Sequence, residues 1–147
     1  MRNTFEGAAV RESGARSLRA FLPPGEPCAT LHDATVLGAD IDPAGGAGVI
    51  EMSIYVGCTD DPDPQARERE RKVRMTVEGL RLWESEQPLA AGAWLTSDGP
   101  IAEVGTERAA ELAAQLDPDA GWYLYFADTN SFVYFDAVRI GFEWIGE

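Results

Sequence analysis

The sequence contains few of the residues on which enzyme active sites usually depend. One histidine, His32, and two cysteines occur among 147 residues. No G-x-S-x-G nucleophile motif, P-loop or G-x-G-x-x-G phosphate-binding motif is present. A single histidine does not supply the ligands of a common zinc site. We therefore predict a protein that is not an enzyme and that holds no cofactor or metal.

Long apolar runs and an excess of basic residues are also missing. No stretch reaches the roughly 18 apolar residues of a membrane-spanning helix, and no apolar signal segment begins the chain. Twelve Lys and Arg stand against 25 Asp and Glu, which gives a net charge of −13. Nucleic acids and anionic lipid surfaces bind clustered basic residues, so the charge disfavours both as partners. It is compatible with a basic protein partner, and equally with solubility alone.

The two cysteines, Cys28 and Cys58, form no C-x-x-C pair and have no metal-binding spacing. Nothing in their spacing supports a disulfide, and a domain of this length does not need one to fold. We predict two reduced thiols in a cytoplasmic protein.

The sequence is rich, by contrast, in aromatic residues near its C-terminal end. Nine of its 14 aromatic residues lie between Trp122 and Trp144. Residues 128–131 interrupt this stretch with turn-forming types. The pattern predicts two strands that supply much of the apolar core. Tyr123 and Tyr125 take the alternate positions of the first strand and are candidate binding residues on its other face.

Alternating apolar and polar residues predict three earlier strands, within 28–42, 50–58 and 71–82. The third strand changes phase at Gly79, which indicates a β-bulge, and its charged start is typical of a sheet edge. A second change of phase near residues 136–137 indicates another bulge or bend. Residues 90–96 are ambiguous and are compatible with a short strand, and residues 97–100 are predicted to form a turn.

One helix is predicted over 106–116, with Thr106 as its N-cap and an apolar stripe on one side. Residues 1–27 are predicted to be a partly ordered N-terminal arm, and residues 28–147 a single β-rich domain. The arm contains Leu18, Phe21 and Leu22 on one side of a short helical segment. The predicted fold is mainly β (α+β), an antiparallel sandwich or strongly curved sheet of five to six strands with one helix.

His32 and Asp33 are the first candidates for chemistry, because a histidine beside a carboxylate can act as a general base. Adjacent residues of a strand point to opposite faces, so this pair is not oriented by sequence proximity alone. A structural histidine at the start of the strand is the favoured interpretation. A binding role for both residues stays open.

Several charged clusters have interpretations that involve no ligand. The acidic group Asp60, Asp61 and Asp63 lacks the ligand spacing of an EF-hand, and we predict a solvated, partner-facing acidic loop. The basic residues within 67–74 are interleaved with glutamates and have no aromatic among them. We expect them to pair with the protein's own acidic surface instead of with nucleic acid. The two acids within 40–42 share one strand face and are predicted to be surface residues.

A family resemblance rests on the segment Leu31-His32-Asp33-Ala34, followed by a strand, a turn and an alternating strand, and on Val77-Glu78-Gly79-Leu80-Arg81-Leu82. This order resembles small, uncharacterised bacterial β-rich proteins with a His-Asp-Ala or His-Asp-Ser segment, some of them immunity-like proteins of polymorphic toxin systems. The resemblance covers about residues 30–83 and 121–145. It implies a non-enzymatic cytoplasmic protein in which His32 and Asp33 are signature positions.

Three hypotheses about function follow from the sequence. The first is a protein-binding module, immunity-like in kind, whose acidic surface meets a basic protein. The second is a small-ligand binder or enzyme that uses His32 and Asp33 in a concavity of the sheet. The third is a self-associating protein that dimerises through an uncovered aromatic face, so the protein is predicted to be a monomer or a homodimer.

Overall fold

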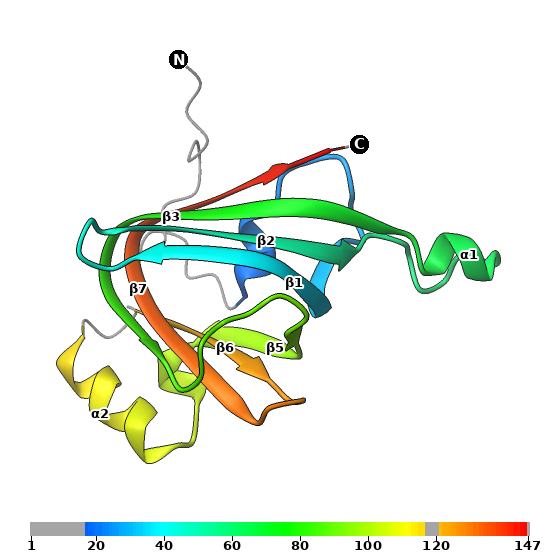
Figure 1. The fold of residues 1–147 in the computed structure, drawn as a ribbon. Helices are drawn as coiled ribbons and strands as arrows, with labels where there is room; N and C mark the ends of the chain where they lie inside the picture. Colours follow the sequence, from blue (N-terminus) through cyan, green and yellow to red (C-terminus); the bar gives the residue numbers. More distant parts are fainter. Residues whose placement is uncertain (1–16, 117–120, 147) are drawn as a thin grey trace.

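The protein is mainly β, as predicted, and its strands form one curled antiparallel sheet. The computed structural model describes residues 17–116 and 121–146. Seven strands follow the order β4-β1-β2-β3-β7-β6-β5. The sheet curls strongly (Figure 1), and its two edge strands, β4 and β5, are joined through Thr96. The result is a nearly closed barrel with one strand more than the sequence indicated.

The elements in chain order are η2 (Leu18–Phe21), β1 (Thr30–Asp42), β2 (Ala47–Tyr55), α1 (Pro64–Arg67), β3 (Glu70–Ser85), β4 (Trp94–Leu95), β5 (Ser97–Pro100), η3 (Ile101–Glu103), α2 (Glu107–Gln115), β6 (Trp122–Phe126) and β7 (Ser131–Trp144).

The curvature of the sheet begins at a bulge in β3. Gly79 has a φ of 65°, and the register of β3 against β7 shifts between Leu80 and Leu82. Arg81 is therefore an extra residue on β3, and residues 136–137 of β7 stand opposite it. The two phase changes predicted from the sequence are thus the two sides of one bulge, where the strand bends.

The prediction that β3 is an edge strand is wrong, because β3 lies between β2 and β7. Its charged side chains are matched across the outer face of the sheet instead. Arg74 contacts Glu51 at 2.9 Å and Glu143 at 2.7 Å. The predicted turn over 97–100 is also wrong, since these residues form β5 and pair with β6.

Apolar side chains fill the interior of the barrel. Alternate residues of β2 point inward and are buried, as the sequence pattern predicts. Residues outside the sheet also reach the same core, among them Leu18 from η2 and Leu89 from the loop of residues 86–93. The space that remains at the centre is about 10 Å³, which is about the least that holds one water molecule. The interior is a packed core.

The described part of the predicted N-terminal arm is ordered against this core. Leu18 is 0% exposed, and the Phe21 ring contacts Trp122 edge to face at 5.9 Å. The Asp98 carboxylate accepts hydrogen bonds from the backbone N–H of Leu18 at 2.6 Å and from Ser17 Oγ at 3.3 Å. Burial raises the pKa of Asp98 above its ordinary value, and these two hydrogen bonds oppose the rise. Residues 1–16 lie outside the described residues.

A second, smaller core forms where α2 covers the outer face of β6 and β7. Its buried members are Ile101, Ala109, Leu112 and Tyr134. Thr106 caps the helix by accepting a hydrogen bond from the Ala109 N–H at 3.1 Å, and its hydroxyl lies 3.0 Å from that of Tyr134. The predicted helix and N-cap are confirmed.

Cys28 and Cys58 are joined by a disulfide, so the prediction of two reduced thiols is wrong. Cys28 precedes β1 and Cys58 follows β2, and Thr30 pairs with Tyr55 across these strands. Antiparallel pairing therefore brings the two cysteines to the same end of the hairpin, with 5.1 Å between their Cα atoms. Disulfides persist mainly in oxidising compartments, so this bond does not favour the predicted cytoplasmic location.

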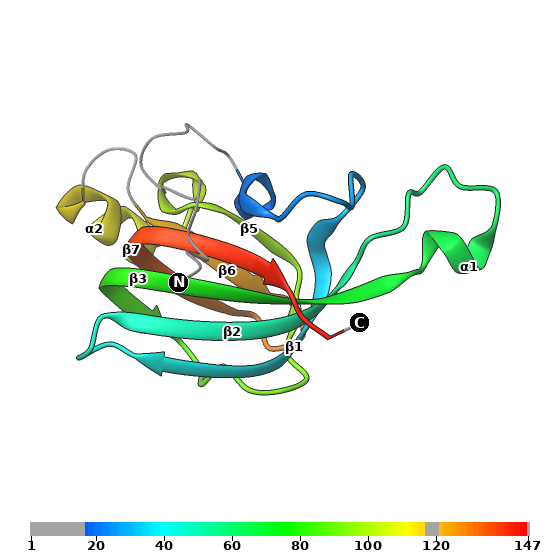
Figure 2. The ribbon, with the colours of Figure 1, turned by 90° about the horizontal axis from the view of Figure 1, so that it is seen from above.

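A segment between β2 and β3 projects from the barrel (Figure 2), and the disulfide-bonded Cys58 lies three residues after the end of β2, where this segment begins. The predicted loop over 59–66 is confirmed, except that residues 64–67 form the one-turn helix α1. Within the described ranges, 17–116 and 121–146, no helix has the length and apolar character needed to cross a membrane.

Candidate functional site

The residues His32 and Asp33 lie in a bulge of β1. Thr30 pairs with Tyr55 and Thr35 with Ser53, so β1 advances five residues where β2 advances two. Asp33 has a φ of 69°, a left-handed conformation that Asp tolerates better than most residues. The extra residues of β1 are therefore displaced from the regular pleat.

This bulge places the two side chains together, which contradicts the expectation that they point to opposite faces. His32 Nδ1 lies 3.2 Å from Asp33 Oδ1, and their side chains are 63% and 43% exposed. The Trp94 indole N–H donates to the same Asp33 oxygen at 3.0 Å. The His32 side chain is mostly in solvent, and the favoured interpretation of a structural histidine stays a prediction.

Trp94 is the residue that sequence reasoning missed at this site. It is 50% exposed, although it is one of the largest side chains in the protein. It pairs with Thr35 on β1, which pairs in turn with Ser53 on β2. These neighbours are too small to cover an indole ring. The available sequence signal was a lone tryptophan after the small residues 90–93.

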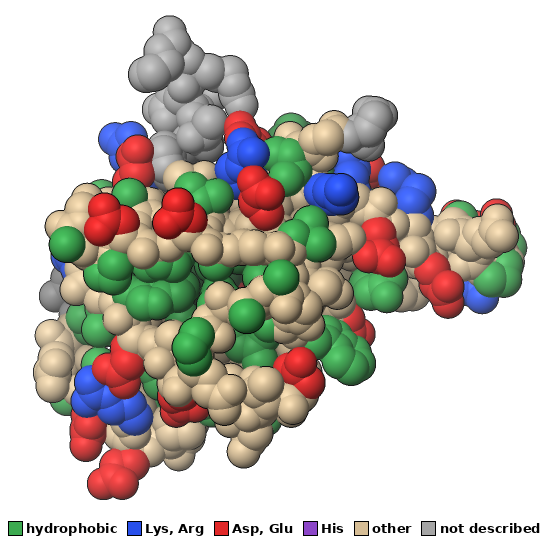
Figure 3. All heavy atoms as spheres, viewed as in Figure 1, with side chains coloured by type: hydrophobic (Ala, Val, Ile, Leu, Met, Phe, Trp, Pro, Cys, Tyr) green, Lys and Arg blue, Asp and Glu red, His purple; other side chains and the backbone are tan. Residues whose placement is uncertain are grey.

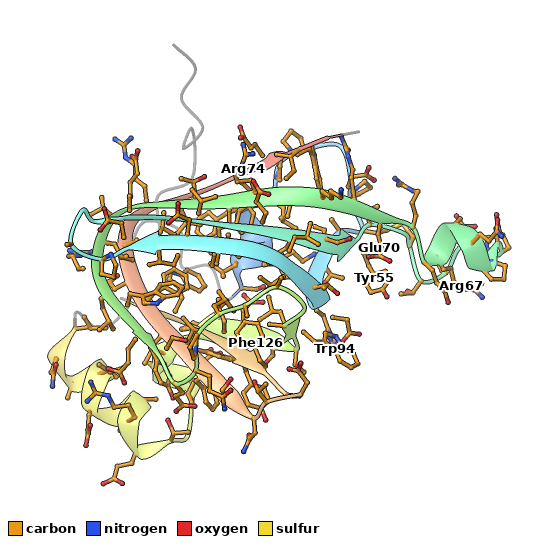
Figure 4. The ribbon with its side chains drawn as sticks, viewed as in Figure 1. Tyr55, Arg67, Glu70, Arg74, Trp94 and Phe126 are labelled. Carbon is orange, nitrogen blue, oxygen red and sulfur yellow. A yellow bond between two sulfur atoms is a disulfide. The ribbon has the colours of Figure 1, made fainter. Side chains whose placement is uncertain are left out.

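Tyr55 extends this exposed surface. It stands two residues beyond Ser53 on the outer face of β2, and successive odd positions of a strand share a face. Figure 4 shows Tyr55 and Trp94 at the same end of the barrel, beside the projecting α1 segment. We call His32, Asp33, Tyr55 and Trp94 the Trp94 surface.

The surroundings of the Trp94 surface carry more acidic than basic side chains: two carboxylates lie there, together with the exposed Lys72, which pairs with Ser53. Glu70 on β3 is the cross-strand partner of Tyr55 on β2. Its Oε1 accepts a hydrogen bond from Ser53 Oγ at 2.7 Å. Asp33 adds a second carboxylate. Both carboxylates lie beside an exposed aromatic ring, an arrangement that suits a cationic side chain.

Nearby arginines do not offset these acids, because they are engaged elsewhere. Arg69 and Arg71 both bind Glu26, at 2.7 and 3.0 Å. The hydrogen bond from Arg69, reinforced by that from Arg71, holds the pKa of Glu26 below its ordinary value against the opposing effect of burial. The predicted pairing of the basic stretch with the protein's own acids is thereby observed.

The predicted acidic loop lies on the projecting segment at this same end of the barrel (Figure 1). Asp61 Oδ1 accepts a hydrogen bond from the Asp63 N–H, and Asp63 Oδ1 accepts one from the Gln65 N–H, both at 3.0 Å. These two carboxylates therefore order the loop and cap α1. Asp60 is exposed beside them. In the described part of the chain, no group of three His, Cys, Asp or Glu is arranged to hold a metal ion.

Tyr123 and Tyr125 lie elsewhere, on the outer face of β6, where the sequence pattern placed them. Phe132 contacts both rings, at centroid distances of 6.0 and 4.8 Å. The Tyr125 hydroxyl donates to Asn130 Oδ1 at 2.7 Å, and Tyr123 packs on the small core under α2. The structure does not bring these tyrosines together with His32.

No residue of the Trp94 surface lines either of the two surface hollows found among the described residues. One surface hollow of about 340 Å³ lies between residues 87–93 and the β6–β7 turn, and another is formed by residues 17–29. His32 lines neither of them. What the site presents is two aromatic faces, a histidine and two carboxylates, all reachable by a large partner.

No protein-family model, curated protein or solved structure matches this chain. The function is therefore argued from the geometry of the site.

Proposed function

We propose that the protein is a non-enzymatic binding module whose Trp94 surface meets a basic protein partner. The observation that carries this proposal is the state of Trp94: its side chain is half exposed, yet its indole N–H is fixed on Asp33 at 3.0 Å. Tryptophan is enriched among the residues that dominate binding energy at protein interfaces.

The hydrogen bond to Asp33 gives the exposed ring a defined orientation. A side chain that is already oriented loses less conformational entropy when a partner covers it. Asp33 is itself held in the bulge and contacts His32. The bulge therefore holds the Trp94 ring in a fixed orientation on the surface, and Tyr55 supplies a second ring on the same outer face.

The charge around the Trp94 ring favours a basic partner. Asp33 and Glu70 flank the two rings, and an Arg or Lys over an aromatic face gains further from a cation–π contact. The net charge of −13 attracts a basic protein over a longer range. An immunity-like role, in which the partner is a basic toxin domain, is the specific form of this proposal that the sequence resemblance favours.

The packed interior supports a binding site on the outer surface. Barrels that hold small molecules enclose a cavity, and the cavity found among the described core side chains is about 10 Å³. Binding to a macromolecule through an exposed face needs no such cavity.

The proposal predicts that Trp94→Ala loses the partner while the fold is kept. Tagged wild-type protein is used at low salt to capture proteins from the host lysate. A captured basic protein is then purified and titrated against each variant by calorimetry. We expect Trp94→Ala to weaken binding by about 30-fold or more, as for an interface residue worth about 2 kcal/mol.

Val138→Ala is the matched control, because Val138 is 48% exposed on β7, away from the Trp94 surface. We expect this variant to bind like the wild type. The proposal is wrong if both variants bind equally well, or if no captured protein is basic.

A further inference from the structure

Parts of two strands, β1 and β3, are paired with a neighbouring strand on one side only. Residues 38–42 of β1 pair with β2 on one side. On the other side of β1, β4 pairs no further along than Thr35, and the loop that precedes β4 forms hydrogen bonds with the backbone of Val36 only. Residues 82–85 of β3 pair with β7 alone, because β2 ends opposite Glu78 and the last contact on that side is the hydrogen bond from the Leu80 N–H to Gly46 O at 2.9 Å. In the described ranges, no strand lies between these edges. We call them the seam.

Apolar side chains are incompletely covered at the seam. Ala39 of β1 pairs with the buried Ile50 but is itself exposed, and Ile41 is only partly buried. Trp83 of β3 and Leu89 of the following loop are likewise partly buried where they pack on the core. Figure 3 shows hydrophobic side chains gathered on this face of the molecule. The seam therefore combines unpaired backbone edges with accessible apolar surface.

The charge of the β1 edge identifies the occupant that fits it. Strand β1 contains no Lys or Arg, and Asp40 and Asp42 are exposed near its end. A second copy of the chain that paired through the same edge would place its aspartates beside these, and like charges on neighbouring strands repel. A strand with basic side chains would instead meet two carboxylates.

We propose that an extended basic segment of the partner adds to the free edge of β1 as a further strand. Its apolar residues point toward the barrel core and alternate with Lys or Arg residues that face Asp40 and Asp42. Strand addition of this kind draws its affinity from backbone hydrogen bonds and its specificity from alternate side chains. This inference rests on the proposed function, which supplies the basic partner, and it adds the form that the bound segment takes.

The free edge also sets the length of that segment. Among the described residues, the five residues 38–42 pair with a strand on one side only, and at about 3.4 Å per residue they offer roughly 17 Å of edge. A segment of about five to eight residues covers it. The Trp94 surface lies beyond the other end of this edge, where β4 pairs with Ala34 and Thr35, so one partner can contact both.

The test uses the full chain and a defined probe, a capped peptide of alternating lysine and valine, about eight residues long. Affinity is measured by calorimetry, and the binding position by the amide shifts of the isotope-labelled protein. We expect the shifts to concentrate on residues 37–42. Methylating the backbone nitrogen of every valine in the peptide removes strand donors, and we expect this change to abolish binding.

Charge variants test the proposed orientation. Asp40→Lys replaces the attraction between a carboxylate and the peptide lysines by a repulsion. It should weaken the affinity for the lysine–valine peptide by about five- to tenfold. It should also create binding of a glutamate–valine peptide. Glu68→Lys, on the projecting segment, makes the same change in net charge at an exposed residue outside the proposed binding surfaces and should leave the affinity within about twofold.

Equal weakening by Asp40→Lys and Glu68→Lys would overturn the inference, because the peptide would then sense only overall charge. Undiminished binding of the methylated peptide, or shifts outside residues 37–42, would overturn it as well. Trp94→Ala should bind the peptide normally. A partner that is insensitive to Trp94→Ala therefore counts against the proposed function, and a peptide that does not bind the β1 edge counts against strand addition.

Discussion

Removal of the disulfide between Cys28 and Cys58 should lower the stability of the whole barrel. The bond closes a loop across a sequence separation of 30. In the chain-entropy description, a loop of this length restricts the unfolded chain by about 3.6 kcal/mol at 25 °C. The native hairpin already holds the two residues at its open end, because Thr30 pairs with Tyr55. The folded structure should therefore change little when the bond is absent.

The double variant Cys28→Ala, Cys58→Ala removes the bond without leaving reactive thiols. We expect its free energy of unfolding in guanidinium chloride to fall by about 3–4 kcal/mol relative to the oxidised wild type. For a domain of this size, that change corresponds to roughly a 10 °C lower Tm. Wild-type protein held in reductant is the control, and should unfold at nearly the same denaturant concentration as the double variant.

A double variant within about 0.5 kcal/mol of the oxidised protein would refute this reasoning. Mass spectrometry after alkylation of the unreduced protein provides an independent check. Two alkylated cysteines in protein purified under oxidising conditions would show that the bond does not form.

Two further stability predictions concern the contact between η2 and the barrel. Leu18→Ala should cost about 2–5 kcal/mol, because Leu18 is 0% exposed in the core, whereas the neighbouring exposed Ala20→Ser should stay within about 0.5 kcal/mol in urea unfolding. Asp98 has a pKa raised above its ordinary 3.8 by burial, so its contribution to stability is complete at pH values below 3.8 and is lost as the pH rises through the folded-state pKa. Urea unfolding should therefore show the stability of Asp98→Asn improving relative to wild type as the pH rises from about 4 toward 7, and a pH-independent difference would count against this.

Much of the fold could be predicted from residue patterns along single strands. Alternation in residues 50–58 identified β2, and the capping residue Thr106 identified the start of α2. The break in phase at Gly79 identified the bulge of β3. Each of these signals is local, because side-chain periodicity and capping depend on residues that are neighbours in sequence.

Features that depend on pairing between distant residues were predicted poorly. The charged start of β3 looked like an edge because its partners Glu51 and Glu143 come from two other strands. The disulfide required the register of β1 against β2, which the positions of two cysteines do not contain.

The candidate site was predicted only in part, for the same reason. His32 and Asp33 were singled out, but regular alternation argued against their contact, and the bulge that brings them together has no clear signal in the sequence. Trp94 could not be connected with Asp33 because 61 residues separate them along the chain.

The binding position on the barrel can be located directly by hydrogen exchange with the captured basic partner. Bound partner should slow exchange in the segments around residues 30–36, 50–56 and 92–97, which carry the Trp94 surface. Protection confined to residues 121–135, which carry Tyr123 and Tyr125, would contradict the proposed binding surface. An exchange pattern unchanged by the partner would contradict it equally.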